Sequence, residues 1–180
     1  IESILNQSFE DFEFLIMDDA SDDNSPDIIK DFARIDGRII TFKSNINVGL
    51  AKSLNILIKN SRSELLARMD GDDISIRNRL EIQYDFMKKN KHIDFIGTGA
   101  NLIDKNSNFI CHKYIPRRIE KVIKSMPYFN HITHPTVMMR KAMIQRNGYY
   151  NEKYKTGQDW ELWQRNIKNG VEFEIIRDKL

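Results

Sequence analysis

The sequence predicts an α/β protein with a mostly parallel central sheet that is flanked by helices. Short apolar segments with strand character alternate with amphipathic segments that have helical spacing. This alternation is typical of β-α-β units, whose strands run parallel. Acidic loops at residues 18–25 and 70–73 follow directly after two of these strands. Because such sheets bind ligands beyond the carboxyl ends of their strands, we expect the two loops to share one edge and one site.

The first half of the chain carries the clearest alternation. It opens with IESILNQ, in which Ile1, Ile4 and Leu5 share a helix face, so the chain is expected to begin inside an element, after a missing upstream strand. The following segments predict a strand at 12–17, a helix capped by Ser25 with Pro26 in its first turn, a strand at 38–42, a helix at 50–60, a strand at 64–69 and a long helix at 76–90 capped by Ser75.

The second half is less regular. It predicts a strand at 93–104, a turn at 105–108, a further apolar segment at 109–115, a basic amphipathic helix at 117–126, a strand at 133–140 and a short helix at 141–149. The segment 157–170 is expected to be a helix with Gly170 as its C-cap. Its Trp160, Trp163 and Ile167 form a helical stripe that we assign to the core. The final segment, VEFEIIRDKL, shows no clear closing element.

Composition limits the classes of function. The 180 residues, 41% hydrophobic and 30% charged, suit one globular domain. With 28 basic and 26 acidic residues the net charge is only +2, so no nucleic-acid partner is indicated. Cys111 is the single cysteine, which excludes an intrachain disulfide and favours a reducing, cytoplasmic location. No apolar run approaches the roughly 20 residues that span a bilayer, and no signal peptide is visible.

The first candidate site is the acidic segment MDGDD, which follows the apolar strand at 64–69. Asp70 and Asp72 are two positions apart, so in an extended segment both face the same side. Gly71 allows a sharp bend and a close ligand approach. Together with Asp73 they offer the oxygen ligands that Mg²⁺ or Mn²⁺ takes when it also binds substrate phosphates. An exposed, solvated turn explains the same residues equally well.

Two further acidic positions are candidates. Asp18 and Asp19 end a strand, where a carboxylate can accept the imide N–H of a nucleobase, although a helix-capping loop is the favoured interpretation when this segment is taken alone. Asp159 lies in the first turn of a helix, where it either favours the helix dipole or acts as a general base at a pocket rim. The four histidines lack zinc spacing, and no nucleophile elbow is present.

Together these motifs resemble family 2 glycosyltransferases, which have the Rossmann-like GT-A fold. The stretches that carry the resemblance are SILNQSFEDFEFLIMDDASDDNSPDIIKDF, NVGLAKSLNILIKNSRSELLARMDGDD, RLEIQYDFMKKN, HPTVMMRKA and GQDWELW, in the family's order and spacing. The family usually opens with a central apolar strand, and this chain starts after it.

The resemblance assigns roles to individual residues. It implies that Asp19 contacts the nucleobase and that Asp18 supports its loop. Asp70 and Asp72 match the D-x-D motif that binds metal and donor diphosphate, and Asp73 is expected to share this task. Asp159 matches the catalytic base, although Gln158 stands where the family often has Glu. His134 matches a His-Pro position near the site and receives no firm role.

The implied activity is an inverting transfer of a sugar from a nucleotide-diphosphate sugar, expected to carry UDP, to an acceptor hydroxyl. The cofactor is Mn²⁺ or Mg²⁺, and the acceptor is a glycan or a lipid-linked glycan in polysaccharide biosynthesis. Residues 1–104 would form the nucleotide-sugar-binding half of a single domain, and 105–180 the acceptor and base half.

Three alternatives stay open. The chain could be a non-catalytic nucleotide-binding or structural part of a larger synthase. It could be a phosphotransfer domain that uses LIMDDAS as an acidic pocket, although the Lys and Thr or Ser positions of such a domain are not evident. The basic stretch HKYIPRRIEKVIK could rest on the inner face of an anionic membrane, but an ordinary solvated helix face is the favoured interpretation.

Overall fold

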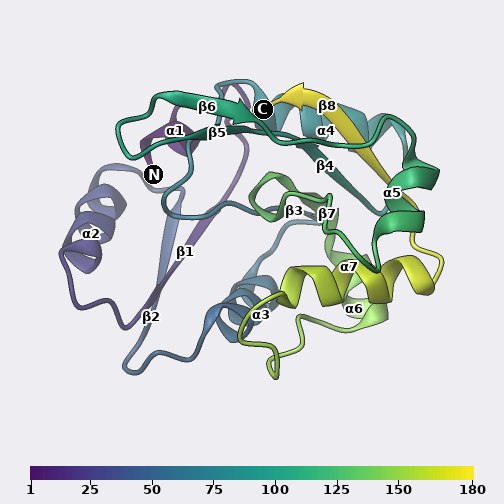
Figure 1. Ribbon diagram of the computed structural model, residues 1–180. Helices are drawn as coiled ribbons and strands as arrows, with labels where there is room; N and C mark the ends of the chain where they lie inside the picture. Colours follow the sequence, from purple (N-terminus) through teal and green to yellow (C-terminus); the bar gives the residue numbers. More distant parts are fainter.

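Strands and helices alternate along the chain, and the computed structural model describes all 180 residues (Figure 1). In chain order the elements are α1 (Glu2–Leu5), β1 (Phe14–Asp19), α2 (Ser25–Ile35), β2 (Ile39–Ser44), α3 (Leu50–Asn60), β3 (Leu65–Ala67), α4 (Arg79–Lys89), β4 (Phe95–Gly99), β5 (Asn101–Ile103), β6 (Phe109–His112), α5 (Ile119–Ser125), the 3₁₀ helix η1 (His134–Thr136), β7 (Met138–Arg140), α6 (Lys141–Asn147), α7 (Gln158–Lys168) and β8 (Phe173–Lys179). The α/β class is confirmed.

The strands form three sheets. A four-stranded sheet has the order β3-β7-β4-β8, whereas β1 pairs only with β2, and β5 pairs only with β6. β1 and β2 are parallel, as are β4 and β8. β7 runs antiparallel to both β3 and β4, and β5–β6 is an antiparallel hairpin. The sheet arrangement is therefore mixed.

The four-stranded sheet carries a hydrophobic core on each face because successive strand residues point to opposite sides. In β4, Phe95 belongs to the larger cluster, while its neighbour Ile96 belongs to the smaller one. The larger cluster includes Trp163 of α7, whose ring stacks on that of Phe95 at 4.8 Å. The smaller cluster includes Met87 of α4. In Figure 1, α4 accordingly lies on one side of the sheet, and α6 and α7 lie on the other.

Several predicted boundaries are wrong in detail. The long helix begins at Arg79 after an Asn78 N-cap, and Ser75 is instead buried against Gln7, whose Nε2 lies 3.2 Å from its hydroxyl. Ser25 is the first residue of α2 rather than its cap, and Asn24 takes the N-cap position. The predicted strand at 93–104 is divided between β4 and β5, and the final segment forms β8 in parallel with β4.

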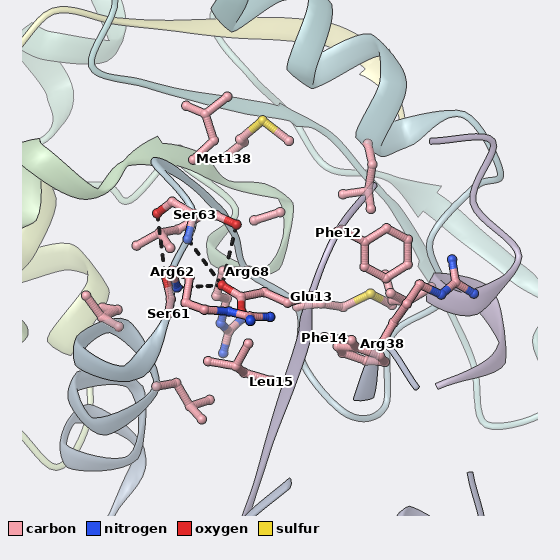
Figure 2. Close-up of a pocket in the computed structure, with 18 of the residues that line it drawn as sticks. Phe12, Glu13, Phe14, Leu15, Arg38, Ser61, Arg62, Ser63, Arg68 and Met138 are labelled. Atoms are coloured by element: carbon pink, nitrogen blue, oxygen red, sulfur yellow. Dashed lines mark hydrogen bonds and ion pairs between the residues drawn. The ribbon is translucent and has the colours of Figure 1, made fainter. Parts of the chain in front are cut away.

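An apolar cleft of about 770 Å³ lies beside β1, between the two-stranded and four-stranded sheets (Figure 2). Its hydrophobic lining includes Phe14 and Leu15 of β1, Leu54, Leu57 and Ile58 of α3, Leu65 and Leu66 of β3, and Met138 and Met139 of β7. Glu13, the residue before β1, lines this cleft and connects this part of the chain to the segment between α3 and β3. Its carboxylate accepts hydrogen bonds from the Arg62 backbone N–H at 2.6 Å and the Arg62 Nε at 2.8 Å.

No helix in this fold combines the length and the apolar character that a membrane crossing requires. The two tryptophans behave as expected for core residues. Trp163 is fully buried in the larger cluster. Trp160 and Ile167 are partly buried and pack against that cluster. The Trp160 indole donates a 2.6 Å hydrogen bond to the carbonyl of Met126, so the stripe fixes α7 against the chain that follows α5.

Candidate functional site

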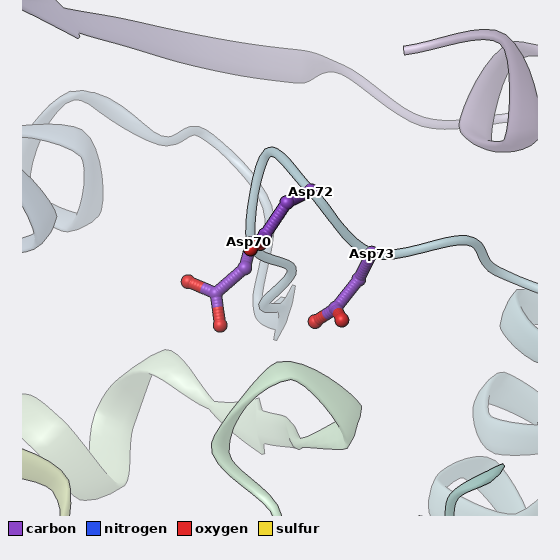
Figure 3. Close-up of side chains that lie close together, drawn as sticks. All are labelled: Asp70, Asp72 and Asp73. Atoms are coloured by element: carbon purple, nitrogen blue, oxygen red, sulfur yellow. The ribbon is translucent and has the colours of Figure 1, made fainter. Parts of the chain in front are cut away.

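The segment after β3 gathers three carboxylates at one turn (Figure 3). Backbone pairing with the neighbouring strand continues one residue past β3, where the Arg68 N–H donates to the Val137 carbonyl at 2.9 Å. The chain then turns, and one oxygen from each of Asp70, Asp72 and Asp73 lies within 4.8 Å of the others. Asp72 and Asp73 are exposed, and Asp70 is partly exposed.

This donor set fits a hard divalent cation. Three carboxylates in one turn supply the oxygen ligands that Mg²⁺ and Mn²⁺ prefer. Partial burial raises the pKa of Asp73 above its ordinary value, and the negative charges of Asp70 and Asp72 raise it further. Part of the side chain remains open to solvent. Mutual repulsion of this kind is relieved by a bound cation.

Two buried arginines lie close to the acidic turn. The Arg68 guanidinium pairs with both oxygens of Asp70, with Nη1 donating to Oδ2 at 2.5 Å. Arg79 donates from Nη2 to the Arg68 carbonyl at 2.8 Å and from Nε to Gln83 at 2.9 Å. Burial lowers the pKa of Arg79 to about 10, which still leaves it charged near neutral pH. Sequence analysis missed both residues, although an arginine at the end of the apolar run LLARM was a visible signal.

Asp18 and Asp19 end β1, as the sequence indicates, but both carboxylates already have local partners. Asp19 accepts hydrogen bonds from the backbone N–H groups of Val48 at 2.9 Å and Gly49 at 2.8 Å, which connects β1 to the start of α3. Asp18 is buried and accepts from the Ser21 N–H at 3.0 Å. Its other oxygen lies 3.8 Å from the Lys43 ammonium. Neither carboxylate caps α2, whose N-cap is Asn24, so the capping role that the sequence suggested is not observed.

Asp159 lies in the first turn of α7, as predicted. Its Oδ2 accepts a 2.8 Å hydrogen bond from Asn130 Nδ2, which fixes the orientation of the carboxylate. Lys113 lies close enough for the two charges to interact. Burial lowers the pKa of Lys113, and the attraction of Asp159 opposes this shift. Asn130 and Lys113 were not found from the sequence, because both come from loops far from Asp159 along the chain.

A buried pair lies between the acidic turn and α7. The His134 Nε2 and the Tyr150 hydroxyl are 2.8 Å apart. Burial, followed by the charge of Arg68, lowers the pKa of His134 to about 2, so the ring stays neutral. Burial raises the pKa of Tyr150, and Asp159 and Asp70 add to this effect while Arg68 opposes it.

The charges of Asp159, Asp70 and Arg68 all act on the buried Tyr150 hydroxyl. The structure thus has the acidic turn and the expected base within electrostatic range of one buried group. It holds Asp18 and Asp19 at the end of β1, in a different sheet, so the expectation that they share a site with the acidic turn stays a prediction.

Comparison with known proteins identifies the relatives of the chain. A family model described as "Glycosyl transferase family 2" matches residues 1–148. An uncharacterized glycosyltransferase of Methanocaldococcus jannaschii is 36% identical over 183 residues, which cover 100% of this chain and 62% of that protein. The O-antigen biosynthesis glycosyltransferase WbnJ of Escherichia coli is 34% identical over 166 residues, covering 92% of this chain and 64% of WbnJ. The chain therefore spans less than two thirds of either relative.

Solved structures show the same fold at lower identity. Staphylococcus aureus TarS residues 1–349 in complex with UDP superposes with a TM-score of 0.73 and 20% identity, covering 99% of this chain and 53% of that one. The mannosyltransferase PcManGT of Pyrobaculum calidifontis, in complex with GDP-Man and Mn²⁺, gives a TM-score of 0.73 at 15% identity and covers 98% of this chain and 49% of that one. Both support a GT-A arrangement.

Proposed function

The chain belongs to glycosyltransferase family 2, and on this premise we propose that it moves a sugar from a nucleotide-diphosphate sugar to an acceptor hydroxyl. The observation that carries the proposal is the cluster of three carboxylates in the acidic turn, with Asp70 and Asp159 both within electrostatic range of the buried Tyr150 hydroxyl. A metal-diphosphate site and a carboxylate base in one neighbourhood are what such a transfer requires.

We propose UDP as the nucleotide of the donor. TarS, a protein of the same fold, has been solved with UDP, whereas PcManGT holds GDP-Man, so the fold alone accommodates either base. Asp19 is the proposed base contact, with Asp18 supporting its loop. For Asp19 this role would add to its hydrogen bonds with Val48 and Gly49, since a carboxylate has about four acceptor positions.

Asp70, Asp72 and Asp73 would hold Mn²⁺ or Mg²⁺ together with the diphosphate. When bound, such an ion neutralises the charge that develops on a departing diphosphate. The Mn²⁺ in the PcManGT complex supports a divalent ion for this fold. Asp70 would move from Arg68 to serve as a ligand, and the more exposed Asp72 and Asp73 are free to turn toward the same point.

Asp159 is the proposed general base. Its carboxylate would take the proton of the acceptor hydroxyl while that oxygen attacks the anomeric carbon, and Asn130 would hold it in position. A single carboxylate base outside the metal cluster suits a direct displacement, which inverts the anomeric centre. We accordingly assign nucleotide-sugar binding to residues 1–104 and acceptor binding with the base to 105–180.

The acceptor is proposed to be a glycan or a lipid-linked glycan. WbnJ is named for O-antigen biosynthesis, which places a related sequence in polysaccharide assembly. The present chain spans 64% of WbnJ.

Calorimetry with UDP and GDP, each with Mn²⁺ and then with EDTA, tests this proposal. UDP should bind with Mn²⁺ and lose at least about tenfold in affinity with EDTA, the scale of one lost charge-assisted contact of about 1.5 kcal/mol. Asp72→Asn should produce the same loss. Asp31→Asn is the matched control, because Asp31 is exposed and pairs only with Arg34 on α2. Equal UDP affinity with and without metal would refute the metal site, and no binding of either nucleotide would favour a structural part of a larger synthase.

A further inference from the structure

Arg68 occupies the oxygens that a cation would need. Its two terminal nitrogens pair with the two oxygens of Asp70, the first residue of the acidic turn. The Arg68 side chain is 6% exposed, whereas that of Asp70 is 36% exposed. A bidentate pair of this kind is directional and strong, and it places a positive charge against the carboxylate, so a cation that binds Asp70 competes with Arg68.

Only the end of the Arg68 side chain has freedom to change partners. Its backbone is fixed on both sides, because its N–H donates to Val137 and its carbonyl accepts from Arg79. Its Nε is buried without any hydrogen-bond partner. Arg79, by contrast, has neighbours for its guanidinium in Gln83 and the Arg68 carbonyl. Arg68 is therefore the cation whose only side-chain partner is a proposed metal ligand.

A buried arginine that loses its carboxylate needs another anion, because an uncompensated buried charge is strongly unfavourable. His134 and Tyr150 lie nearby, but both are neutral and cannot serve. A nucleoside diphosphate brings such an anion to the site together with the metal. Guanidinium groups match phosphate oxygens as well as they match carboxylates.

We propose that Arg68 is a counter-ion switch that makes binding of the divalent cation and of the nucleotide diphosphate cooperative. This inference rests on the proposed metal and donor site. In the free protein Arg68 holds Asp70 and weakens binding of metal alone. When both ligands arrive, Asp70 turns to the cation and Arg68 pairs with the diphosphate. Arg68 is thus a positioning residue, and its effect appears as a coupling between two ligands, which must be reciprocal.

The test measures that coupling directly. Mn²⁺ affinity is measured by electron paramagnetic resonance with and without saturating UDP, and the ratio of the two constants is the coupling factor. The wild-type factor is expected to lie within the usual range of about 5- to 150-fold. In Arg68→Gln, Mn²⁺ alone should bind severalfold more tightly because its competitor is gone. The coupling factor should fall severalfold, leaving only the part that comes from direct contact between the metal and the diphosphate. Arg68→Lys should keep part of the coupling, since a lysine is a point charge without the bidentate fork.

Arg34→Gln is the matched control. It removes the same charge from an exposed pair with Asp31 and should leave both constants unchanged. Thermal melting of every variant verifies folding. If Arg68→Gln does not fold, the Arg68→Lys comparison decides: tighter binding of Mn²⁺ alone supports the switch, and an unchanged or weaker constant overturns it.

The remaining outcomes are equally distinct. A wild-type coupling factor retained in Arg68→Gln, or weaker binding of Mn²⁺ alone in that variant, overturns the switch and leaves the proposed function intact. Failure of the wild-type chain to bind Mn²⁺ with or without UDP removes the metal site itself, and the inference falls with it.

Discussion

His134 is a buried imidazole that should make stability depend on pH. Its ring Nε2 is hydrogen-bonded to the Tyr150 hydroxyl, and its pKa is lowered to about 2, first by burial and then by the charge of Arg68. In the unfolded chain an imidazole takes up its proton near pH 6.5. The unfolded state therefore binds more protons below that pH, and the stabilising contribution present above pH 6.5 is lost as the pH falls toward the folded-state pKa.

The expected loss approaches about 1.4 kcal/mol per pH unit at most. His134→Gln should flatten the decline in unfolding free energy between pH 6.5 and 4.5, above the range where ordinary carboxylates titrate. Urea unfolding at closely spaced pH values measures it. The exposed His92→Gln serves as control and should follow the wild-type slope. Parallel slopes for wild type and His134→Gln would show that the ring is already accessible to protons.

Asp159 separates the proposed base from a helix-end residue. Asp159→Asn keeps the size of the side chain and an oxygen that can accept from Asn130, but it cannot take a proton. Transfer to acceptor should fall by about 10²-fold or more, while UDP affinity is retained. The helix dipole predicts only about 0.3–1 kcal/mol of lost stability.

Glu161→Gln gives the matched control, because Glu161 lies in the same helical turn and pairs with Arg165. It should lower the melting temperature by a comparable amount and leave turnover per folded molecule unchanged. Near-wild-type transfer by Asp159→Asn, measured on the same samples, would remove the catalytic assignment.

The candidate site residues could be predicted from the sequence more readily than the residues that hydrogen-bond or pair with them. The acidic turn was visible because Asp70, Asp72 and Asp73 are adjacent in sequence, and Asp159 because it follows a helix-start signal. Asn130 and Arg68 escaped notice, since a hydrogen bond to a distant loop or a buried ion pair leaves no local periodicity. The partners of Asp19 were likewise invisible, because the hydrogen bonds it accepts come from residues 48 and 49.

At the scale of elements, the connection between β1 and α3 is open to test. The two oxygens of Asp19 accept hydrogen bonds from the backbone N–H groups of Val48 and of Gly49, the N-cap residue of α3. A carboxylate here also favours the positive end of the helix dipole. Asp19→Asn should therefore lower the unfolding free energy by about 1–3 kcal/mol, the range for a hydrogen-bonded charged group.

The exposed Asp22→Asn, in the same loop, is the control and should change stability little. If Asp19 also contacts the base, Asp19→Asn should weaken uridine and UDP alike after correction for the folded fraction. A loss confined to UDP would place Asp19 in the diphosphate site, and an unchanged melting temperature would show that its two backbone bonds contribute little.

Helices and strands could be predicted where a periodic face is long. The predicted range of α3 is the observed one, Leu50–Asn60. Prediction failed where tertiary contacts decide the ends. Ser75 was expected to cap a helix, but it is buried against Gln7, and α4 begins only at Arg79. The antiparallel position of β7 between β3 and β4 was also hidden, since strand pairing depends on which distant apolar faces stack.

At the scale of the molecule, the β1–β2 layer is expected to be the least stable part. Neither hydrophobic core includes a fully buried residue before Ala51, and α2 has no buried residue. β1 has β2 as its single strand partner, and an apolar cleft lies beside it. Regions with few buried contacts open at lower free energy than the core.

Hydrogen exchange measured by mass spectrometry should consequently show faster exchange in β1, β2 and α2 than in β4 and α7. The contrast follows from packing, since β4 is buried along its whole length and α7 contributes Leu162 and Trp163 to the larger core. Uniform protection across these peptides would show that the two sheets open as one unit. It would refute the prediction that the β1–β2 layer is the least stable part.

Ligand binding should reduce the difference in exchange rate between β1–β2 and α7 if the donor contacts both sheets. Asp19 belongs to the two-stranded sheet, and Asp70, Asp72 and Asp73 follow a strand of the four-stranded one. A nucleotide diphosphate held by both sheets would stabilise the native state against local opening by about 2.7 kcal/mol when its concentration is 100 times its Kd. UDP with Mn²⁺ should therefore slow exchange in β1 and β2 by up to about 100-fold while changing α7 little, because each 1.4 kcal/mol is a factor of ten. Asp72→Asn at the same ligand concentrations is the control and should show slowing that is smaller by at least about tenfold, because its affinity for UDP is lower by that factor. Slowing confined to the residues around the acidic turn would place the whole ligand on the four-stranded sheet and remove Asp19 from the donor site.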